Sequence, residues 1–165
     1  VSAETIQKTI KPWTARTSPL PTKKCSVVLG PDGQPVPSEV APGSDSAQAL
    51  TTLRLYFDSL NQGDYPTALA QFVKPLPLEV FSKGVQSSND TDFVVQDVVR
   101  TPSKITVWLT FTSQQQAGSG PAARPQETCT DWSLDYVMRP HNGLWLIDAT
   151  KGHGTASRPC AKPPA

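Results

Sequence analysis

Two carboxylates near the end of the chain are placed where they could do chemistry together. Asp135 and Asp148 flank a turn-forming stretch, so the two strands of a hairpin would bring them opposite one another. Facing carboxylates can share a proton or hold a cation. A cation site usually recruits more than two ligands, however, and Arg139 or Lys151 would lie beside this pair on a solvated outer face. We therefore predict no metal site and no cofactor.

The two histidines and the familiar catalytic motifs give no complete active site. His141 lies in a turn and His153 in the Gly-rich stretch KGHGT, and neither has a nucleophile at a recognisable spacing. The sequence contains no GxSxG, no phosphate-binding loop and no HExxH. The triplet Asn89-Asp90-Thr91 fits the N-glycosylation pattern, which carries no catalytic role. From motifs alone we assign no catalytic residue.

Four aromatic side chains in the second half of the chain are candidates for ligand binding. They could line a cavity for a small apolar molecule. They could also form the core of a domain in which a sheet packs on helices, and the sequence leaves both interpretations open. The four residues are Trp108, Trp132, Tyr136 and Trp145.

An amphipathic helix over residues 45–61 is the element that the rest of the chain must pack against. Residues 44–46 offer N-cap side chains and Gly63 provides a stop. A second, shorter helix is expected over 65–73, ending before Pro75. The apolar positions that define the longer helix by their spacing are Leu50, Leu53, Phe57 and Leu60.

In the second half of the chain the hydrophobic period changes to two, which predicts two antiparallel hairpins. In the first hairpin Val99 is expected opposite Thr106, with apolar residues on both faces, as in a hairpin covered on two sides. In the second, Met138 is expected opposite Trp145 around a turn at 140–143, and the same register produces the carboxylate pair. The expected strands are 92–100, 104–113, 128–138 and 144–150.

The three cysteines lack the close spacing of a zinc site and favour one disulfide plus one free thiol. The strand that begins at Leu144 would carry the chain back past Cys129 and place Gly154 opposite it, after which the stretch TASRP can turn back. We therefore predict the pair Cys129–Cys160, with Cys25 unpaired. The alternatives are Cys25–Cys160, which would join the two ends of the chain, and no disulfide in a reducing cytoplasm.

The chain of 165 residues is long enough for one domain, and many of its 17 prolines lie towards its two ends. We divide it into a Pro-rich basic leader or linker at 1–43, a domain at 44–152 and a C-terminal tail at 153–165. No apolar run reaches membrane-spanning length and no signal peptide is recognisable. The first residue is Val, as expected of a mature form or an excised domain.

Charge is unevenly distributed along the sequence. Residues 1–24 and those after Thr150 hold eight of the 15 basic residues and one of the 14 acidic ones, which leaves the centre acidic. A nucleic-acid-binding domain would carry its positive charge on the folded face, so we predict no nucleic-acid partner. The basic leader suits either a solvated linker or a segment beside an anionic membrane.

The stretch LRLYFDSLNQGDYPTALAQF and the closing GLWLIDAT resemble the NTF2-like (cystatin-like) superfamily over about residues 46–150. The resemblance implies an α+β cone, in which a curved, mostly antiparallel sheet wraps around the N-terminal helices and leaves a pocket on its concave face. Enzymes of the ketosteroid-isomerase and polyketide-cyclase type share this fold and use an acid or base inside the cone. Among the functional groups of these enzymes, only a hydrogen-bond donor has a counterpart in this sequence, at Tyr56. No acidic residue of the sequence matches their catalytic base. The Pro-rich leader is similar to those on NTF2-like domains of bacterial cell-envelope proteins.

These observations favour a non-catalytic extracytoplasmic interaction or sensor domain of a secreted or membrane-anchored cell-envelope protein. The alternatives are a carrier of a small apolar ligand and a cofactor-free isomerase or cyclase of the ketosteroid-isomerase type. A deep cavity containing a buried carboxylate would favour the enzyme. The expected partner is a protein or a small apolar ligand, and the sequence leaves open whether the chain forms a homo-oligomer. The residues expected to bind a ligand are Tyr56, Trp108, Trp132, Tyr136 and Trp145.

Overall fold

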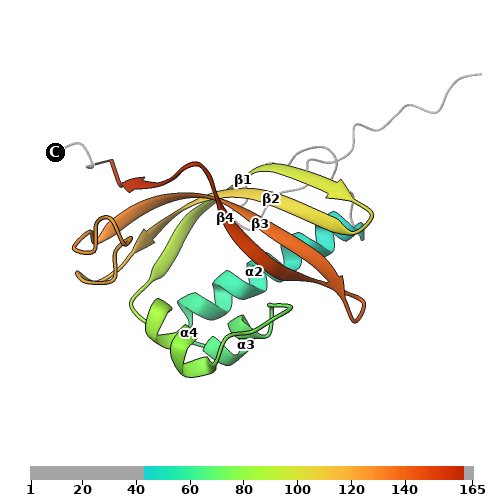
Figure 1. Cartoon of the computed structure of the whole chain (residues 1–165), viewed down its shortest axis with the longest axis horizontal. Helices are drawn as coiled ribbons and strands as arrows, with labels where there is room; N and C mark the ends of the chain where they lie inside the picture. Colours follow the sequence, from blue (N-terminus) through green and yellow to red (C-terminus); the bar gives the residue numbers. More distant parts are fainter. Residues whose placement is uncertain (1–42, 162–165) are drawn as a thin grey trace, which may run out of the picture.

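The computed structural model describes residues 43–161, and within them helices precede strands. The helices are α2 (Asp45–Asn61), α3 (Tyr65–Leu69) and α4 (Leu78–Val85). The strands are β1 (Asn89–Thr101), β2 (Lys104–Gln114), β3 (Cys129–His141) and β4 (Leu144–Pro159). The sheet arches over α2, with α3 and α4 near one end of that helix (Figure 1). No helix in this part of the chain is long and apolar enough to cross a membrane.

The long helix α2 has the bounds that the sequence predicts, because both of its ends carry clear signals. Ser44 is the N-cap, and its side chain accepts a hydrogen bond from the backbone N–H of Ala47. Asp45 in the first turn interacts favourably with the positive end of the helix dipole. The chain leaves the helix through Gly63, whose φ of +73° is a left-handed conformation that glycine adopts readily.

The second helix ends earlier than expected, at Leu69 instead of residue 73. The segment after it pairs with the edge of the sheet: the N–H of Val73 donates to the carbonyl of Ile147, and the N–H of Ile147 donates to the carbonyl of Gln71, both at 2.8 Å. Because β4 is the last strand of the sheet, this segment covers backbone groups that an open edge would expose. The next stretch, expected to be mostly loop, forms α4.

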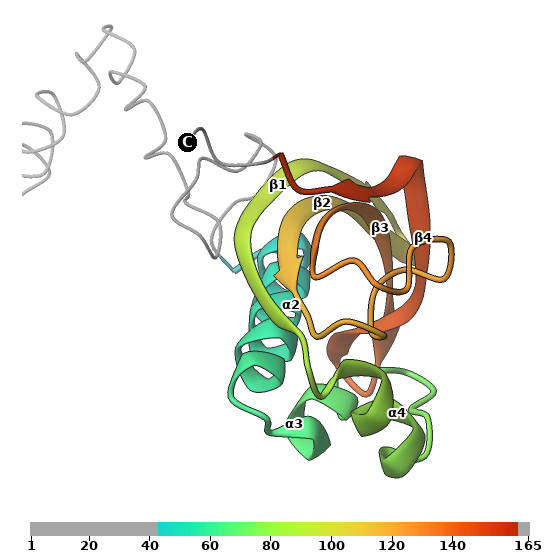
Figure 2. The same ribbon diagram turned by 90° about the vertical axis from the view of Figure 1, so that its left-hand side faces the viewer.

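The strands form one antiparallel sheet in the order β1-β2-β3-β4, as the two predicted hairpins require. The first hairpin has the expected register, with Val99 opposite Thr106. Val99 on its outer face is 53% exposed, and register shifts in β1 change which residues face the core. Within residues 43–161 the helices lie only on the concave side of the sheet, so no described element covers the second face of the hairpin, contrary to the prediction (Figure 2).

The second hairpin turns one position later than expected. Its loop residues are Asn142 and Gly143, and their φ angles of +50° and +80° suit a type I′ turn. Met138 therefore pairs with Ile147 and not with Trp145. A shift of two residues keeps the same side chains on the core face, which is why the hydrophobic pattern fits both registers.

Strand β4 extends past residue 152, where we placed the domain boundary, and ends at Pro159. Its pairing with β3 is interrupted between Gly152 and Ser157, where β4 has more residues than the strand beside it. The sheet therefore includes part of the stretch expected to be a tail.

One apolar core fills the space between the sheet and the helices. Leu53 and Phe57 from α2 and Trp145 from β4 belong to it, as predicted. Aromatic rings meet edge to face within this core: the ring centroid of Phe57 lies 4.8 Å from that of Tyr56 and 5.8 Å from that of Tyr136. This packing fixes the two tyrosines against each other on the concave side of the sheet.

Candidate ligand cavity

A cavity of about 290 Å³ lies on the concave side of the sheet. Its walls come from α2, α4, the inner faces of the strands and the connection between β2 and β3. That connection crosses the end of the arch that faces the viewer in Figure 2. Much of the lining is apolar or aromatic, and no Lys or Arg is among its described residues. Its hydrogen-bonding side chains include Tyr56, Asp90, Ser113, Gln115 and Tyr136.

Tyr56 and Tyr136 reach the cavity from two different walls, α2 and β3. Their ring centroids lie 6.4 Å apart, and both side chains are buried. Burial raises the pKa of both phenols, and the nearby carboxyl of Asp90 adds to this effect. Among residues 43–161 neither hydroxyl takes part in a hydrogen bond. Two neighbouring hydrogen-bond donors therefore remain available to a ligand in the cavity.

Asp90, a residue that is 6% exposed, supplies a carboxyl group. Asn61 at the end of α2 holds its backbone from both sides: the N–H of Asp90 donates to Asn61 Oδ1 at 2.8 Å, and Asn61 Nδ2 donates to the carbonyl of Asp90 at 2.7 Å. The hydroxyl of Ser113, on the adjacent strand, donates to the carboxyl. Burial raises the pKa of Asp90, and the Ser113 hydrogen bond opposes that rise.

A carboxyl group and two phenols that line one small cavity can form hydrogen bonds with a polar group of a ligand or exchange a proton with it. Phenol hydroxyls donate hydrogen bonds to a carbonyl or to an oxyanion. A buried carboxyl can donate when it is neutral and accept a proton when it is ionised. A buried carboxylate in the cavity was expected to favour an enzyme, and Asp90 is such a group.

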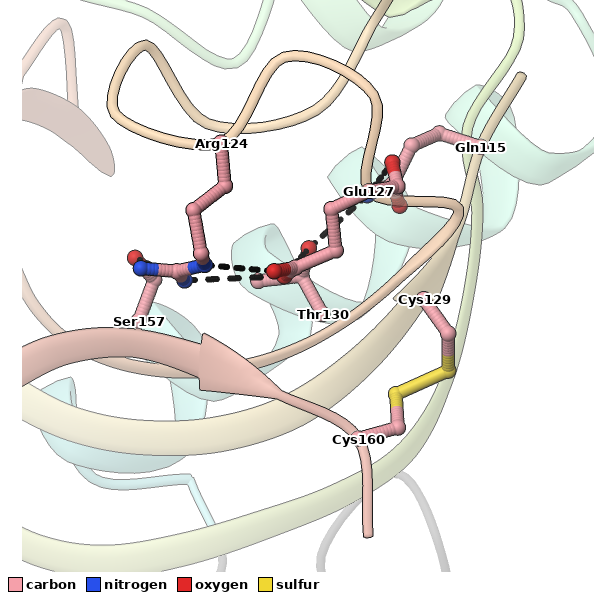
Figure 3. Close-up of polar contacts among 7 residues, drawn as sticks. All are labelled: Gln115, Arg124, Glu127, Cys129, Thr130, Ser157 and Cys160. Atoms are coloured by element: carbon pink, nitrogen blue, oxygen red, sulfur yellow. Dashed lines mark hydrogen bonds and ion pairs between the residues drawn. A yellow bond between two sulfur atoms is a disulfide. The ribbon is translucent and has the colours of Figure 1, made fainter. Parts of the chain in front are cut away.

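The rim of the cavity is held by polar contacts around Gln115 (Figure 3). Gln115 Nε2 donates to the carbonyl of Glu127 at 3.0 Å and to Thr130 Oγ1 at 2.8 Å. Arg124 pairs with the carboxylate of Glu127 and donates to Ser157 Oγ at 3.1 Å. The hydrogen bond from Arg124 lowers the pKa of Glu127. The connection between β2 and β3 is thereby joined to the end of β4.

Cys129 and Cys160 form a disulfide bond beside these contacts, with Cα atoms 5.5 Å apart (Figure 3). The pairing of the cysteines is the predicted one, but the chain reaches Cys160 by a different path from the one expected. Gly154, expected opposite Cys129, lies in the interrupted part of β4, and it is the N–H of Cys160 that donates to the carbonyl of Cys129 at 3.2 Å. Cys25 lies outside the described residues.

A wider groove of about 610 Å³ runs over the outer face of β2 and β3. Trp108 lies in it, stacked on His153 with ring centroids 3.9 Å apart, and its indole N–H donates to Ser133 Oγ at 3.0 Å. His153 Nδ1 forms a hydrogen bond with Asp135 at 2.9 Å. These four side chains thus bond and stack with one another in two pairs, Trp108 with Ser133 and His153 with Asp135, joined by the stacked rings.

The facing carboxylate pair does not form. The register places Lys151, and not Asp148, opposite Asp135. Asp148 pairs instead with Arg139, whose Nε lies 2.8 Å from the carboxylate. The two acidic groups therefore serve separate contacts on the outer face.

The five residues expected to bind a ligand lie in three different places. Tyr56, Trp132 and Tyr136 line the concave cavity. Trp108 faces the outer groove, which Trp132 also borders, and Trp145 is buried in the core.

Sequence reasoning missed Asp90, Ser113 and Gln115. Asp90 was noted only as the middle of a glycosylation triplet, and the other two were assigned to a strand end and a polar loop. The one available signal was polarity at positions that continue the buried alternation of β2, since Phe111, Ser113 and Gln115 are all buried. A polar residue at a buried strand position requires a partner or a ligand.

No family model matches the sequence, and no curated protein matches it. Solved structures do match. A SEC-C motif containing protein from Rhodopseudomonas palustris has a TM-score of 0.51 at 14% identity, covering 64% of this chain and 80% of its own. A ketosteroid isomerase-like protein from Erwinia carotovora atroseptica has a TM-score of 0.49 at 14% identity, covering 66% and 94%. An LEH-like epoxide hydrolase from M. tuberculosis has a TM-score of 0.44 at 6% identity, covering 68% and 83%.

Structural similarity at sequence identities this low supports a conclusion about the fold alone. Helices followed by a curved antiparallel sheet that wraps around them make this an α+β domain with the NTF2-like fold, as the sequence resemblance predicted. The activity of the chain has to be argued from its own cavity.

Proposed function

We propose that this domain binds a small, mostly apolar ligand in its concave cavity and acts as a non-catalytic sensor or carrier domain. The observation that carries the proposal is a pair of tyrosines, Tyr56 and Tyr136, that line the same cavity as Asp90 and whose hydroxyls have no hydrogen-bond partner among the described residues. Unpartnered donors on the wall of a cavity favour a ligand with a carbonyl or another acceptor.

The size and lining of the cavity limit the ligand further. Ligand cavities usually span roughly 300–1,000 Å³, so a volume of about 290 Å³ suits a molecule of about two fused rings. Phe57, Phe111 and Trp132 offer aromatic surface, which favours a flat apolar body. The absence of basic residues from the described lining disfavours an anionic ligand.

An extracytoplasmic location is part of the proposal. The disulfide Cys129–Cys160 supports it, because disulfides persist mainly in oxidising compartments. The basic, Pro-rich leader would then link the domain to a membrane-anchored or secreted protein. A protein partner that responds to the bound ligand would make the domain a sensor.

The test uses 2-acetylnaphthalene, a neutral ketone of suitable size, titrated with the purified chain and followed by its fluorescence. We expect saturable binding that weakens roughly two- to tenfold in Tyr56→Phe and in Tyr136→Phe, the value of one hydrogen bond in each case. Tyr65→Phe is the matched control, because Tyr65 packs against the core but does not line the cavity. Absence of saturable binding, or equal losses in all three variants, would contradict the proposal.

A second candidate is proton transfer at the carbon next to a carbonyl, and Asp90 is the observation that favours it. When ionised, its carboxylate could take the proton while the phenols stabilise the enolate oxygen. The same ketone tests this idea: in D₂O, NMR would show deuterium entering its methyl group, and Asp90→Asn would abolish the exchange. Binding without exchange leaves the sensor or carrier function.

A further inference from the structure

The amide oxygen of Gln115 stands out among the polar groups of the cavity. Gln115 is 8% exposed and lines the cavity. Its Oε1 is the one buried side-chain polar atom within residues 43–161 that has no hydrogen-bond partner. Such an atom is costly to bury unless something donates to it.

Neighbouring contacts fix this oxygen in place. Both N–H donors of the amide are in use, on the carbonyl of Glu127 and on Thr130 Oγ1, so the amide cannot exchange its two ends without losing these bonds. Thr130 is oriented in turn, because its hydroxyl donates to Glu127 Oε1 at 2.6 Å. Arg124 holds that same carboxylate, and the disulfide lies beside the group (Figure 3).

The position of Gln115 is complementary to that of the tyrosines. Gln115 bonds to Thr130 near the start of β3 and to Glu127 just before it, whereas Tyr136 lies six residues after Thr130 on that strand. At about 3.3 Å per residue, roughly 20 Å of strand separates the two levels. The backbones of Ser113 and Asp90 pair at the level of Thr130, but the Asp90 carboxyl is close enough to both phenols to raise their pKa. The distance across the concave side is therefore shorter than this path along the curved strand. The cavity thus offers hydrogen-bond donors at one end and an acceptor at the other.

We infer that Gln115 contacts the ligand and selects one that carries a hydroxyl or N–H donor at the end opposite its carbonyl. The inference rests on the proposed function, because it concerns the same cavity. It narrows the ligand class from an apolar ketone to an elongated molecule with an acceptor at one end and a donor at the other.

The experiment compares two probes that differ by one hydroxyl, 2-acetylnaphthalene and 6-acetyl-2-naphthol. For the wild-type chain we expect the hydroxylated probe to bind roughly two- to tenfold more tightly, as one additional buried hydrogen bond provides. Gln115→Met keeps the side-chain volume and removes the acceptor, so the ratio of the two dissociation constants should fall to about one. Gln116→Met, the same change at the exposed neighbouring position, should leave the ratio unchanged.

Because the ratio compares two probes on one protein, a general loosening of the rim affects both affinities and cancels. If Gln115→Met fails to fold, a third probe, 6-methoxy-2-acetylnaphthalene, replaces the variant: its oxygen cannot donate, so the wild-type chain should bind it no more tightly than 2-acetylnaphthalene, and a preference equal to that for the naphthol would contradict the inference. Equal affinity of the wild-type chain for the two probes would overturn the inference, as expected if a buried water satisfies Gln115. That result leaves binding of 2-acetylnaphthalene intact, whereas failure of both probes to bind overturns the proposed function.

Discussion

Asp90 is held in the cavity by the structure around it and not by a charged partner. Asn61 fixes its backbone and Ser113 donates to its carboxyl, while no Lys or Arg among the described residues lines the same space. Burial therefore acts on this carboxyl with only one hydrogen bond to offset it. The neutral acid is favoured more strongly in the folded chain than in the unfolded one.

The pH dependence of stability follows from that difference. Because the folded chain holds the Asp90 proton more tightly, the free energy of unfolding should fall as the pH rises above about 3.8, the ordinary pKa of this group. Asp90→Asn removes this loss, so the stability of the variant relative to wild type should increase from pH 4 towards pH 8. Urea denaturation across this range measures it, with Asp97→Asn, at an exposed position on the same strand, as the control. A relative stability that stays flat or falls with pH would contradict the burial of Asp90.

The part of the site that could be predicted from sequence is the aromatic part. Trp132 and Tyr136 were candidates because large aromatic residues at alternating strand positions face a common interior, and Tyr56 was one because it matches the hydrogen-bond donor that the family resemblance implies. Asp90 was not predictable, because its burial depends on a register shift in β1. Gln115 had only its place in the alternation of β2 as a signal, and its burial also depends on a connection that folds back over the cavity. Neither feature has a local sequence signal.

At the level of the elements, Trp145 is the residue on which the packing of β4 against the helices can be tested. It is 6% exposed and shares one core with Leu53 and Phe57. Trp145→Ala should lower the free energy of unfolding by about 3–5 kcal/mol, because it removes a large buried ring and leaves a void. Leu144→Ala is the matched control: Leu144, the preceding residue, is 58% exposed, so its truncation should cost less than about 0.5 kcal/mol. Similar costs for the two variants in urea denaturation would contradict the assigned core.

The helix and strand positions were largely predictable, whereas the pairing of β3 with β4 was not. The bounds of α2 follow from its cap and its apolar spacing. In the second hairpin, Pro140 and His141 were counted as turn residues, although Asn142-Gly143 alone satisfies the turn. The interruption between Gly152 and Ser157 could not be foreseen, because a bulge of this kind does not disturb the alternation before it.

For the molecule as a whole, the two ends of the sheet are secured differently. At the hairpin end, the Asn142-Gly143 turn joins β3 directly to β4. At the other end no such turn exists, and β4 has left its regular pairing before it returns to the start of β3. There the covalent bond Cys129–Cys160 and the contact of Arg124 with Ser157 hold the strand end beside the rim of the cavity.

Removal of the disulfide should therefore destabilise the whole domain. In the chain-entropy model, a crosslink across a sequence separation of 31 contributes roughly 3–4 kcal/mol, so the paired changes Cys129→Ser and Cys160→Ser should lower the free energy of unfolding by about that amount. Cys25→Ser should leave it unchanged, because the other two cysteines of the chain are bonded to each other. Urea denaturation gives the energies, and peptide mapping without reduction gives the pairing. A crosslinked peptide containing Cys25 would refute the pairing, and three free thiols in protein taken from its native compartment would refute the extracytoplasmic location as well.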